Sequence, residues 1–172
     1  MGLDQYLYRT INPDLPVDDS EDAYNLASVS FGEITWGEGE DHPQSYANFK
    51  RHLATFTNIE QVAQWRKFNA LHLWMERNCF GGEESNCDRI PVNLEQLAGL
   101  QVTCERVAAD PSLGEDNLPT GGRFFFGSTD YDEWYVKDCE ETAELLKNLI
   151  AEEATFAKDK GCTRQFFYSS SW

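Results

Sequence analysis

Four side chains able to take part in chemistry recur at helical spacing in the stretch Asn58 to Asn78, NIEQVAQWRKFNALHLWMERN. Positions i, i+4, i+7 and i+11 form one line on a helix surface, and this line carries an indole, an amide, an imidazole and a carboxylate. Its members are Trp65, Asn69, His72 and Glu76. An imidazole titrates near neutrality and a carboxylate four residues further on can reach it, so His72 and Glu76 are a candidate acid-base pair. The alternative is that the line is the solvent-facing or hydrogen-bonded strip of the helix.

A second group of carboxylates lies in the sequence DYDEWY, residues 130–135. Asp130, Asp132 and Glu133 could bind a divalent cation or act as an acid-base pair beside stacking aromatic rings. The alternative is that these acids stabilise the start of a helix, where the dipole favours negative charge. If this turn meets the polar line, the two form a ligand pocket from seven residues: Trp65, Asn69, His72, Glu76, Asp130, Asp132 and Trp134.

Other patterns that carry chemistry are weak or missing in the sequence. The glycines at 121–122 and 127 are not part of a phosphate-binding loop, and no serine or cysteine stands in a nucleophile signature. The five cysteines are widely spaced and odd in number, which favours reduced thiols over disulfides or a zinc site. We therefore expect no bound metal and no cofactor, and the sequence gives little support for an enzyme.

Strong acidity is the one extreme value of the composition: 30 acidic against 14 basic side chains, a formal charge of -16. Such a charge repels nucleic acids and anionic membranes and attracts basic protein surfaces. Ten of the acids and one base, Arg9, lie before residue 50. The predicted partner-binding residues come from this region, with Trp36 as an aromatic anchor: Asp18, Asp19, Glu21, Asp22, Trp36, Glu38, Glu40 and Asp41. The alternative is a solvated acidic loop that only keeps the chain soluble.

Hydrophobic patterning predicts the elements that position these residues. Strands are expected at 3–10, 33–36, 123–127 and 163–172, and the segment 14–48 is expected to be largely irregular. Helices are expected at 58–78, beginning with a Thr57–Glu60 capping box, at 94–109, capped by Asn93, and at 132–158. A Thr129–Asp132 pair should cap this last helix, and Gly161 should end it.

The predicted architecture is a single α+β domain over 1–172, with three main helices on a small antiparallel or mixed sheet. No apolar run reaches the ~20 residues that span a bilayer, and the first residues, MGLDQYLYRTI, lack the apolar core of a signal peptide. We therefore expect a cytoplasmic protein without membrane contact.

Four stretches of the sequence resemble a family of small uncharacterised proteins of tailed bacteriophages. They are MGLDQYLYR, WRKFNALHLW, LPTGGRFFFGSTDYDEWY and the closing SSSW, spread over most of the chain. The resemblance implies a virus-encoded protein made in the cytoplasm of an infected bacterium. It implies no reaction and no catalytic residues.

These observations favour two hypotheses of different classes. In the first, the protein is an acidic interaction protein whose carboxylates stand in for phosphates and block the basic groove of a host nucleic-acid-acting defence protein, such as a CRISPR or restriction effector. In the second, it is a small-molecule or nucleotide-binding protein, or a small enzyme, with its pocket between the helix 58–78 and the DYDEWY turn. A virion component is a third option that the sequence leaves open.

Overall fold

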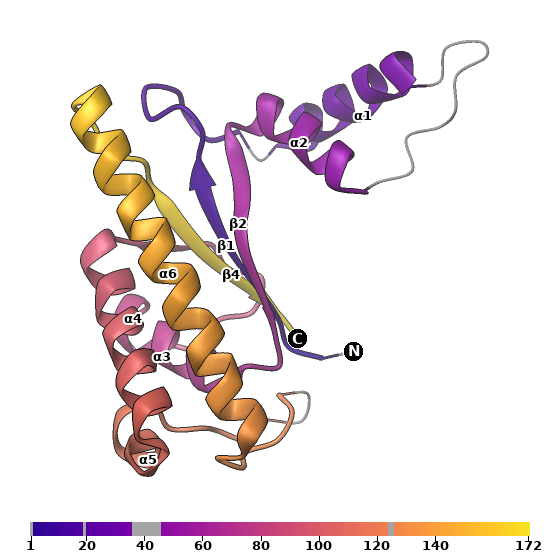
Figure 1. The fold of residues 1–172 in the computed structure, drawn as a ribbon. Coiled ribbons are helices and arrows are strands. Elements are labelled where there is room, and N and C mark those ends of the chain that lie inside the picture. The colour runs from indigo at the N-terminus through magenta and orange to yellow at the C-terminus, as the bar shows by residue number, and fades with distance from the viewer. Residues whose placement is uncertain (1, 19, 36–45, 124–125) are drawn as a thin grey trace. The chain divides into compact units, whose positions relative to one another are not determined.

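The structure is a computed structural model that describes residues 2–18, 20–35, 46–123 and 126–172. By contacts the chain divides into two compact units, residues 1–8 with 61–172 and residues 9–60. The elements in chain order (Figure 1) are β1 (Asp4–Thr10), α1 (Glu21–Thr35), α2 (Tyr46–Thr57), β2 (Ile59–Arg66), α3 (Asn69–Cys79), β3 (Ile90–Val92), α4 (Leu94–Ala109), η1 (Pro111–Leu113), α5 (Gly114–Asn117), α6 (Glu133–Lys160) and β4 (Phe166–Ser171). The α+β class predicted from the sequence is confirmed.

The four strands form one sheet in the order β2-β1-β4-β3. The strands predicted at 3–10 and 163–172 are confirmed as β1 and β4, and they are the two central strands. β3 runs antiparallel to β4, with Ile90 opposite Tyr168. Both central strands alternate buried and more exposed side chains, which is the period that a strand with one covered face requires.

The two long helices α4 and α6 pack side by side in the larger unit (Figure 1). The start of α4 is the predicted one, because Asn93 Oδ1 accepts from the Gln96 amide (2.8 Å) and Gln96 Oε1 accepts from the Asn93 amide (2.9 Å). The helix predicted at 132–158 is confirmed as α6. Asp132 alone is its N-cap, without Thr129, and Gly161 ends it in the left-handed conformation at φ 72°.

The core of the larger unit lies where α3, α4 and α6 meet the sheet. Burying one leucine side chain fully contributes about 1.5–3 kcal/mol to the free energy of unfolding, so the buried apolar side chains of this core are a main source of stability. All five cysteines are free thiols, and Cys104 and Cys139 are buried on the helices where the sequence places them. Fully buried members of the core include Leu7, Leu71, Met75, Ile90, Leu97, Leu100, Val107, Leu118, Leu146 and Tyr168.

The prediction of one helix from 58 to 78 is wrong, because this stretch contains β2, a turn and α3. α2 ends at Thr57, whose hydroxyl donates to the Leu53 carbonyl, so no capping box forms with Glu60. Asn58 and Lys67 have positive φ angles of 58° and 61°, which no helix tolerates. The segment between them therefore pairs with β1, and tertiary pairing overrides the helical period of the sequence.

Three further predictions differ from the structure. Much of the segment predicted as irregular at 14–48 is helical, because Glu21–Thr35 forms α1 and Ser20 Oγ caps it by accepting from the Ala23 amide (3.1 Å). Residues 33–35 of the strand expected at 33–36 belong to this helix, and Trp36 lies outside the described residues. Arg123, Phe126 and Gly127 are not in a strand, and the remaining residues of that predicted strand are not described. β3 was not predicted.

Candidate functional site

The predicted polar line is divided between two elements. Asn69, His72 and Glu76 lie on α3 with 2%, 0% and 5% of their surface exposed, so they are buried and not a solvent-facing strip. Trp65 lies on β2, where its indole Nε1 donates to Thr142 Oγ1 of α6 at 2.9 Å. Only the three residues of α3 therefore remain as one polar line.

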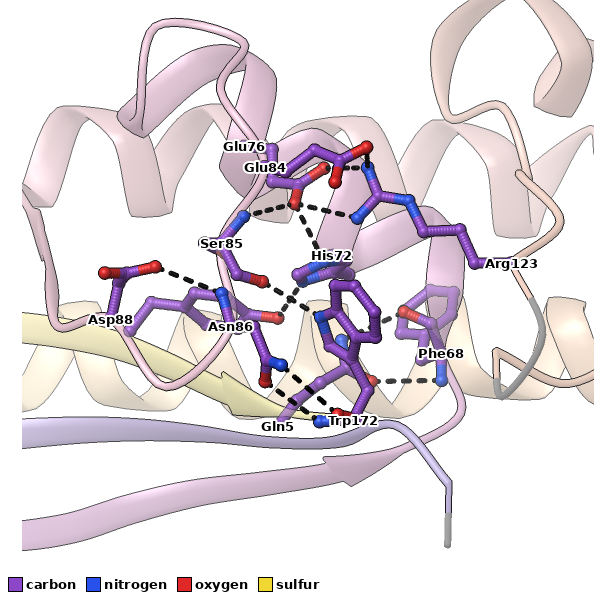
Figure 2. A network of polar contacts seen from close by, with 11 residues as sticks. Gln5, Phe68, His72, Glu76, Glu84, Ser85, Asn86, Asp88, Arg123 and Trp172 are labelled. Carbon is purple, nitrogen blue, oxygen red and sulfur yellow. Dashed lines mark hydrogen bonds and ion pairs between the residues drawn. The ribbon is translucent and has the colours of Figure 1, made fainter.

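Glu76 is the centre of a buried polar network (Figure 2). Its Oε1 accepts from the Ser85 amide at 2.8 Å, and Arg123 reaches both carboxylate oxygens at 3.3 and 3.2 Å. Arg123 also pairs with the exposed Glu84 at 3.2 Å. A buried carboxylate is stable only when its charge is compensated, and the guanidinium and the amide provide that compensation here.

His72 connects this carboxylate to the sheet. Its Nδ1 lies 2.9 Å from the Tyr168 hydroxyl. Its Nε2 lies 3.0 Å from Glu76 Oε1, but outside hydrogen-bond alignment, so the contact is mainly electrostatic. Burial lowers the pKa of His72, and the nearby Arg123 lowers it further, against the opposing effect of Glu76. Burial also raises the pKa of Tyr168.

Asn69 fastens the loop at 121–128 to the start of α3. Its Nδ2 donates to the carbonyls of Phe126 (3.2 Å) and Ser128 (2.7 Å), and its Oδ1 accepts from the Gly121 amide at 3.2 Å. The side-chain amide of Asn69 thus provides hydrogen-bond partners for three backbone groups that lie outside helices and strands.

The other two members of the polar line hold the same loop. The ring of His72 meets Phe126 edge to face at 5.1 Å between centroids, and Glu76 binds Arg123. Trp172 closes the network, with its indole Nε1 donating to the Ser85 carbonyl at 2.9 Å and its ring 5.4 Å from Phe126. The line predicted to supply pocket chemistry therefore positions a loop, and it consists of positioning residues.

A cleft of about 390 Å³ lies beside this loop, within the larger unit. We call it the Lys67 cleft. Asn69, Asp130, Asp132 and Trp134, four of the seven residues of the predicted pocket, line it together; Trp65, His72 and Glu76 do not. The cleft is also lined by three charged residues that were not predicted as site residues: Arg66, Lys67 and Asp138.

Some charged groups of the Lys67 cleft already have partners. Asp132 Oδ1 accepts from the amides of Trp134 and Tyr135, both at 3.0 Å, and so caps α6. Asp130 Oδ2 accepts from the Ser128 hydroxyl at 3.0 Å. The capping interpretation, the alternative in the sequence analysis, therefore describes the contacts of Asp132, whereas Asp130 pairs with Ser128 in the turn before the helix.

Two opposite charges in the cleft have no such partner. Among the residues that the structure describes, neither the Lys67 ammonium nor the Asp138 carboxyl makes a hydrogen bond or ion pair. Burial raises the pKa of Asp138 to about 6; the charges of Glu141 and Asp132 add to the rise, and that of Lys137 opposes it. A carboxyl whose pKa is raised by its surroundings in a cleft is a common sign of a functional site.

The backbone fixes where Lys67 stands. Its amide donates to the Leu3 carbonyl at 2.7 Å, and its carbonyl accepts from the Asn69 amide at 2.9 Å. Gly127, at φ 90°, packs against it so closely that a Cβ added there would lie 3.1 Å from Lys67 Cβ. A left-handed non-glycine residue costs on the order of 1–3 kcal/mol and is held only by well-packed surroundings, which is typical of functional sites.

The predicted partner-binding residues lie in the smaller unit or outside the described part of the chain. Asp19, Trp36, Glu38, Glu40 and Asp41 are not described. Asp18 Oδ1 accepts from the Ser20 amide at 3.0 Å, and hydrogen bonds from Ser20 lower the pKa of Asp18. Glu21 and Asp22 are exposed in the first turn of α1.

The pattern of burial on α1 is the reverse of the pattern on an ordinary surface helix, which buries its large apolar side chains. Its small residues Ala23 and Ala27 are buried, whereas Tyr24, Leu26 and Val29 are 50%, 57% and 61% exposed. The small side chains allow α1 to pack closely on α2, and the larger apolar ones are left in solvent next to the acids. This exposed apolar face is not among the sequence predictions, because the segment 14–48 is expected there to be largely irregular.

Sequence reasoning missed the basic wall of the cleft and Asp138. One signal was available, because Arg66 and Lys67 are adjacent cations in a chain with twice as many acids as bases. Asp138 carries no sequence signal, since one acid on a helix is ordinarily a solvated residue. Within the described ranges, no three His, Cys, Asp or Glu side chains are grouped as metal ligands, and no helix has the length and apolarity to cross a bilayer.

The chain was compared with protein-family models, with curated proteins and with solved structures, and none of the three comparisons found a match. The resemblance to tailed-bacteriophage proteins therefore stays a prediction.

Proposed function

We propose that the protein binds a small polar ligand in the Lys67 cleft. One observation carries the proposal: Lys67 and Asp138, of opposite charge, line the same cleft as the exposed Trp134, and neither charged group makes a hydrogen bond or ion pair with the described residues. A ligand with complementary groups would give both charges a partner. The cleft volume of about 390 Å³ is in the range of small-molecule sites.

The rigid surroundings of the cleft support this proposal. The three polar residues of α3 hold the loop 121–128, and the left-handed turn at Lys67 is packed against Gly127 in that loop. A site built in advance loses less conformational entropy when a ligand binds. A cleft of this kind serves a binding protein or a small enzyme equally well, and no reaction is assigned.

A thermal-melting screen tests the proposal. A ligand at about 100 times its dissociation constant stabilises the folded state by about 2.7 kcal/mol, which corresponds to roughly 5–10 °C for a chain of this size. We expect at least one compound from a panel of nucleotides, nucleosides, sugar phosphates and amino acids to produce such a shift.

Two variants and one control tie the shift to the cleft. Asp138→Asn and Lys67→Asn should abolish it, and asparagine is chosen at 67 because it tolerates a positive φ. Glu140→Gln, on the same helix but outside the cleft, should retain it. A panel without any shift, or a shift that both cleft variants preserve, contradicts the proposal.

A second candidate function is favoured by the exposed face of α1. Leu26 and Val29 stand in solvent beside the acids of the first helical turn, which is the composition of a surface that contacts a basic protein. In this proposal the protein is a bacteriophage inhibitor in the cytoplasm of the host. It blocks the basic groove of a nucleic-acid-acting defence protein, such as a CRISPR or restriction effector.

Affinity capture from bacterial lysate tests this second candidate. We expect the intact protein to retain one nucleic-acid-binding protein at low salt and to release it at high salt, because screening weakens exposed charge pairs. A variant with Glu21→Gln, Asp22→Asn and Leu26→Ser should not retain it, whereas Asp138→Asn should. Equal recovery by all three proteins would refute the α1 surface as an interface.

A further inference from the structure

Resting on the proposed function, we infer that the ligand of the Lys67 cleft is a nucleoside monophosphate. Its phosphate lies on Arg66 and Lys67, a sugar hydroxyl meets Asp138, and the base stacks on Trp134. Each of the three contacts is assigned from a different property of the cleft.

The basic wall selects an anionic group. In the described part of the molecule many cations are paired, among them Arg9 with Glu60 and Arg123 with Glu76. Arg66 has only a loose contact, 3.7 Å to Asp4, with 68% of its side chain exposed, and Lys67 has none. Two consecutive cations in a fixed turn match a phosphate, which arginine binds in a bidentate manner and lysine binds as a point charge.

The acidic wall excludes a ligand that is anionic throughout. Asp130 and Asp132 place two further carboxyl groups in the cleft, and each accepts hydrogen bonds from the protein. Asp138 lies among these acids with its pKa raised to about 6, so it accepts a hydrogen bond when ionised and donates one when protonated. A neutral hydroxyl satisfies it in both states. The ligand therefore has a phosphate at one end and hydroxyl groups at the other, as nucleotides and sugar phosphates have.

The exposed ring of Trp134 favours nucleotides over sugar phosphates as the ligand class. Its indole is 64% exposed at the cleft, and Lys137 Nζ lies 5.6 Å from its ring centroid. An exposed aromatic ring is a stacking platform for a nucleobase, and such stacking tolerates any base. A sugar phosphate would leave the ring unused. The nucleotide is the ligand class that engages the cations, the carboxyl and the indole together.

Isothermal titration calorimetry with matched ligands tests the inference on the full chain. The probes are the four common ribonucleoside monophosphates, the corresponding nucleosides, ribose 5-phosphate and inorganic phosphate. We expect the nucleotides to bind at least tenfold more tightly than the nucleoside, ribose 5-phosphate or inorganic phosphate. Added salt should weaken nucleotide binding and leave nucleoside binding almost unchanged.

Variants assign the contacts within the cleft. Lys67→Asn should reduce nucleotide affinity about tenfold without changing nucleoside affinity. Trp134→Ala should reduce nucleotide affinity about tenfold and leave ribose 5-phosphate unaffected. Glu140→Gln should behave as the unaltered protein. The melting temperature of each variant without ligand shows that it is folded.

The outcomes distinguish this inference from the proposed function. Equal affinity for nucleotide and ribose 5-phosphate, with no effect of Trp134→Ala, would overturn the nucleobase contact. If another compound of the screening panel binds and loses affinity in Asp138→Asn, while no nucleotide binds, the cleft is a ligand site and the inference fails. If nothing binds, both fail.

Discussion

Asp138 lines the Lys67 cleft and has a raised pKa, so the pH dependence of the protein's stability can be used to probe the site. Its ordinary pKa is 3.8, and burial raises it to about 6 in the folded protein. Between these values the folded chain holds a proton that the unfolded chain has released. The free energy of unfolding therefore decreases as the pH rises from about 4 to 6, and the loss persists above this window.

Asp138→Asn should consequently stabilise the protein at pH 7.5. The expected gain is about 1 kcal/mol, once screening of this half-buried carboxyl by solvent is allowed for. The gain should disappear below pH 4, where the carboxyl is protonated in both states. Urea unfolding at pH 3.5 and 7.5 measures it, and a variant that is less stable than the unaltered protein at pH 7.5 would refute the origin assigned to the pKa shift.

His72 gives a pH dependence of opposite sign. Burial lowers its pKa below 6.5, so as the pH falls through 6.5 the unfolded chain takes up a proton that the folded chain resists. The contribution of His72 to the free energy of unfolding is complete above pH 6.5 and is lost as the pH falls below it.

In His72→Gln this loss should be absent. The variant should be less stable than the unaltered protein at pH 8, by about 1–3 kcal/mol, because a buried contact to Tyr168 is altered. The difference between the two should narrow as the pH approaches 5. Melting temperatures from pH 5 to 8 provide the test, and parallel curves for the two proteins would contradict a neutral buried imidazole.

At the scale of elements, the sequence predicted best where local signals and tertiary packing agree. α4 and α6 each carry a cap and an apolar face at the expected place, α6 also ends at the expected Gly161, and the structure confirms their extents to within two residues. The prediction for 58–78 was wrong because the helical period of this stretch is also compatible with a strand that ends at a left-handed residue. Pairing with β1, a contact distant in sequence, decides between the two, and no local pattern records it.

The candidate site shows the same division. Asn69, Asp130, Asp132 and Trp134 line one cleft, because they lie on the two chain segments that meet there. The grouping of His72 and Glu76 with them rested on an uninterrupted helix; in the structure both are buried and contact Phe126 and Arg123. Lys67 and Asp138 needed the tertiary structure, since neither residue type nor spacing marks them.

Asn58 is the residue on which the change from α2 to β2 depends. At φ 58° its side chain accepts from the Asn12 amide at 2.8 Å and donates to the carbonyls of Asn12 (2.9 Å) and Leu15 (2.8 Å). Asn58→Gly keeps the backbone conformation and loses these bonds, at a cost of about 2–3 kcal/mol. Asn58→Ala should cost about 1–2 kcal/mol more, because alanine also disfavours the left-handed region.

Denaturant unfolding of the two variants separates the effects. The order of stability should be unaltered protein, then Asn58→Gly, then Asn58→Ala. Asn12→Ala serves as the control, because it removes one side chain from the same turn without changing a left-handed position. Equal stability of the glycine and alanine variants would show that the backbone conformation contributes nothing.

At the scale of the whole molecule, the two candidate functions use separate units of the chain. The Lys67 cleft belongs entirely to residues 61–172, and the exposed face of α1 belongs to residues 9–60. The smaller unit has ten acidic and three basic side chains, so a second copy of this chain would be repelled and a basic partner attracted. Neither function requires the other.

A variant with Leu26→Ser and Val29→Ser tests this separation. Because both side chains are more than half exposed, their replacement should change the free energy of unfolding by less than about 0.5 kcal/mol. Ligand-induced stabilisation through the cleft should be unchanged, whereas capture of a basic protein should be lost. Asp138→Asn should show the reverse result. If the α1 variant instead unfolds the chain, these side chains are packed in the folded protein, and the surface proposed for a partner does not exist.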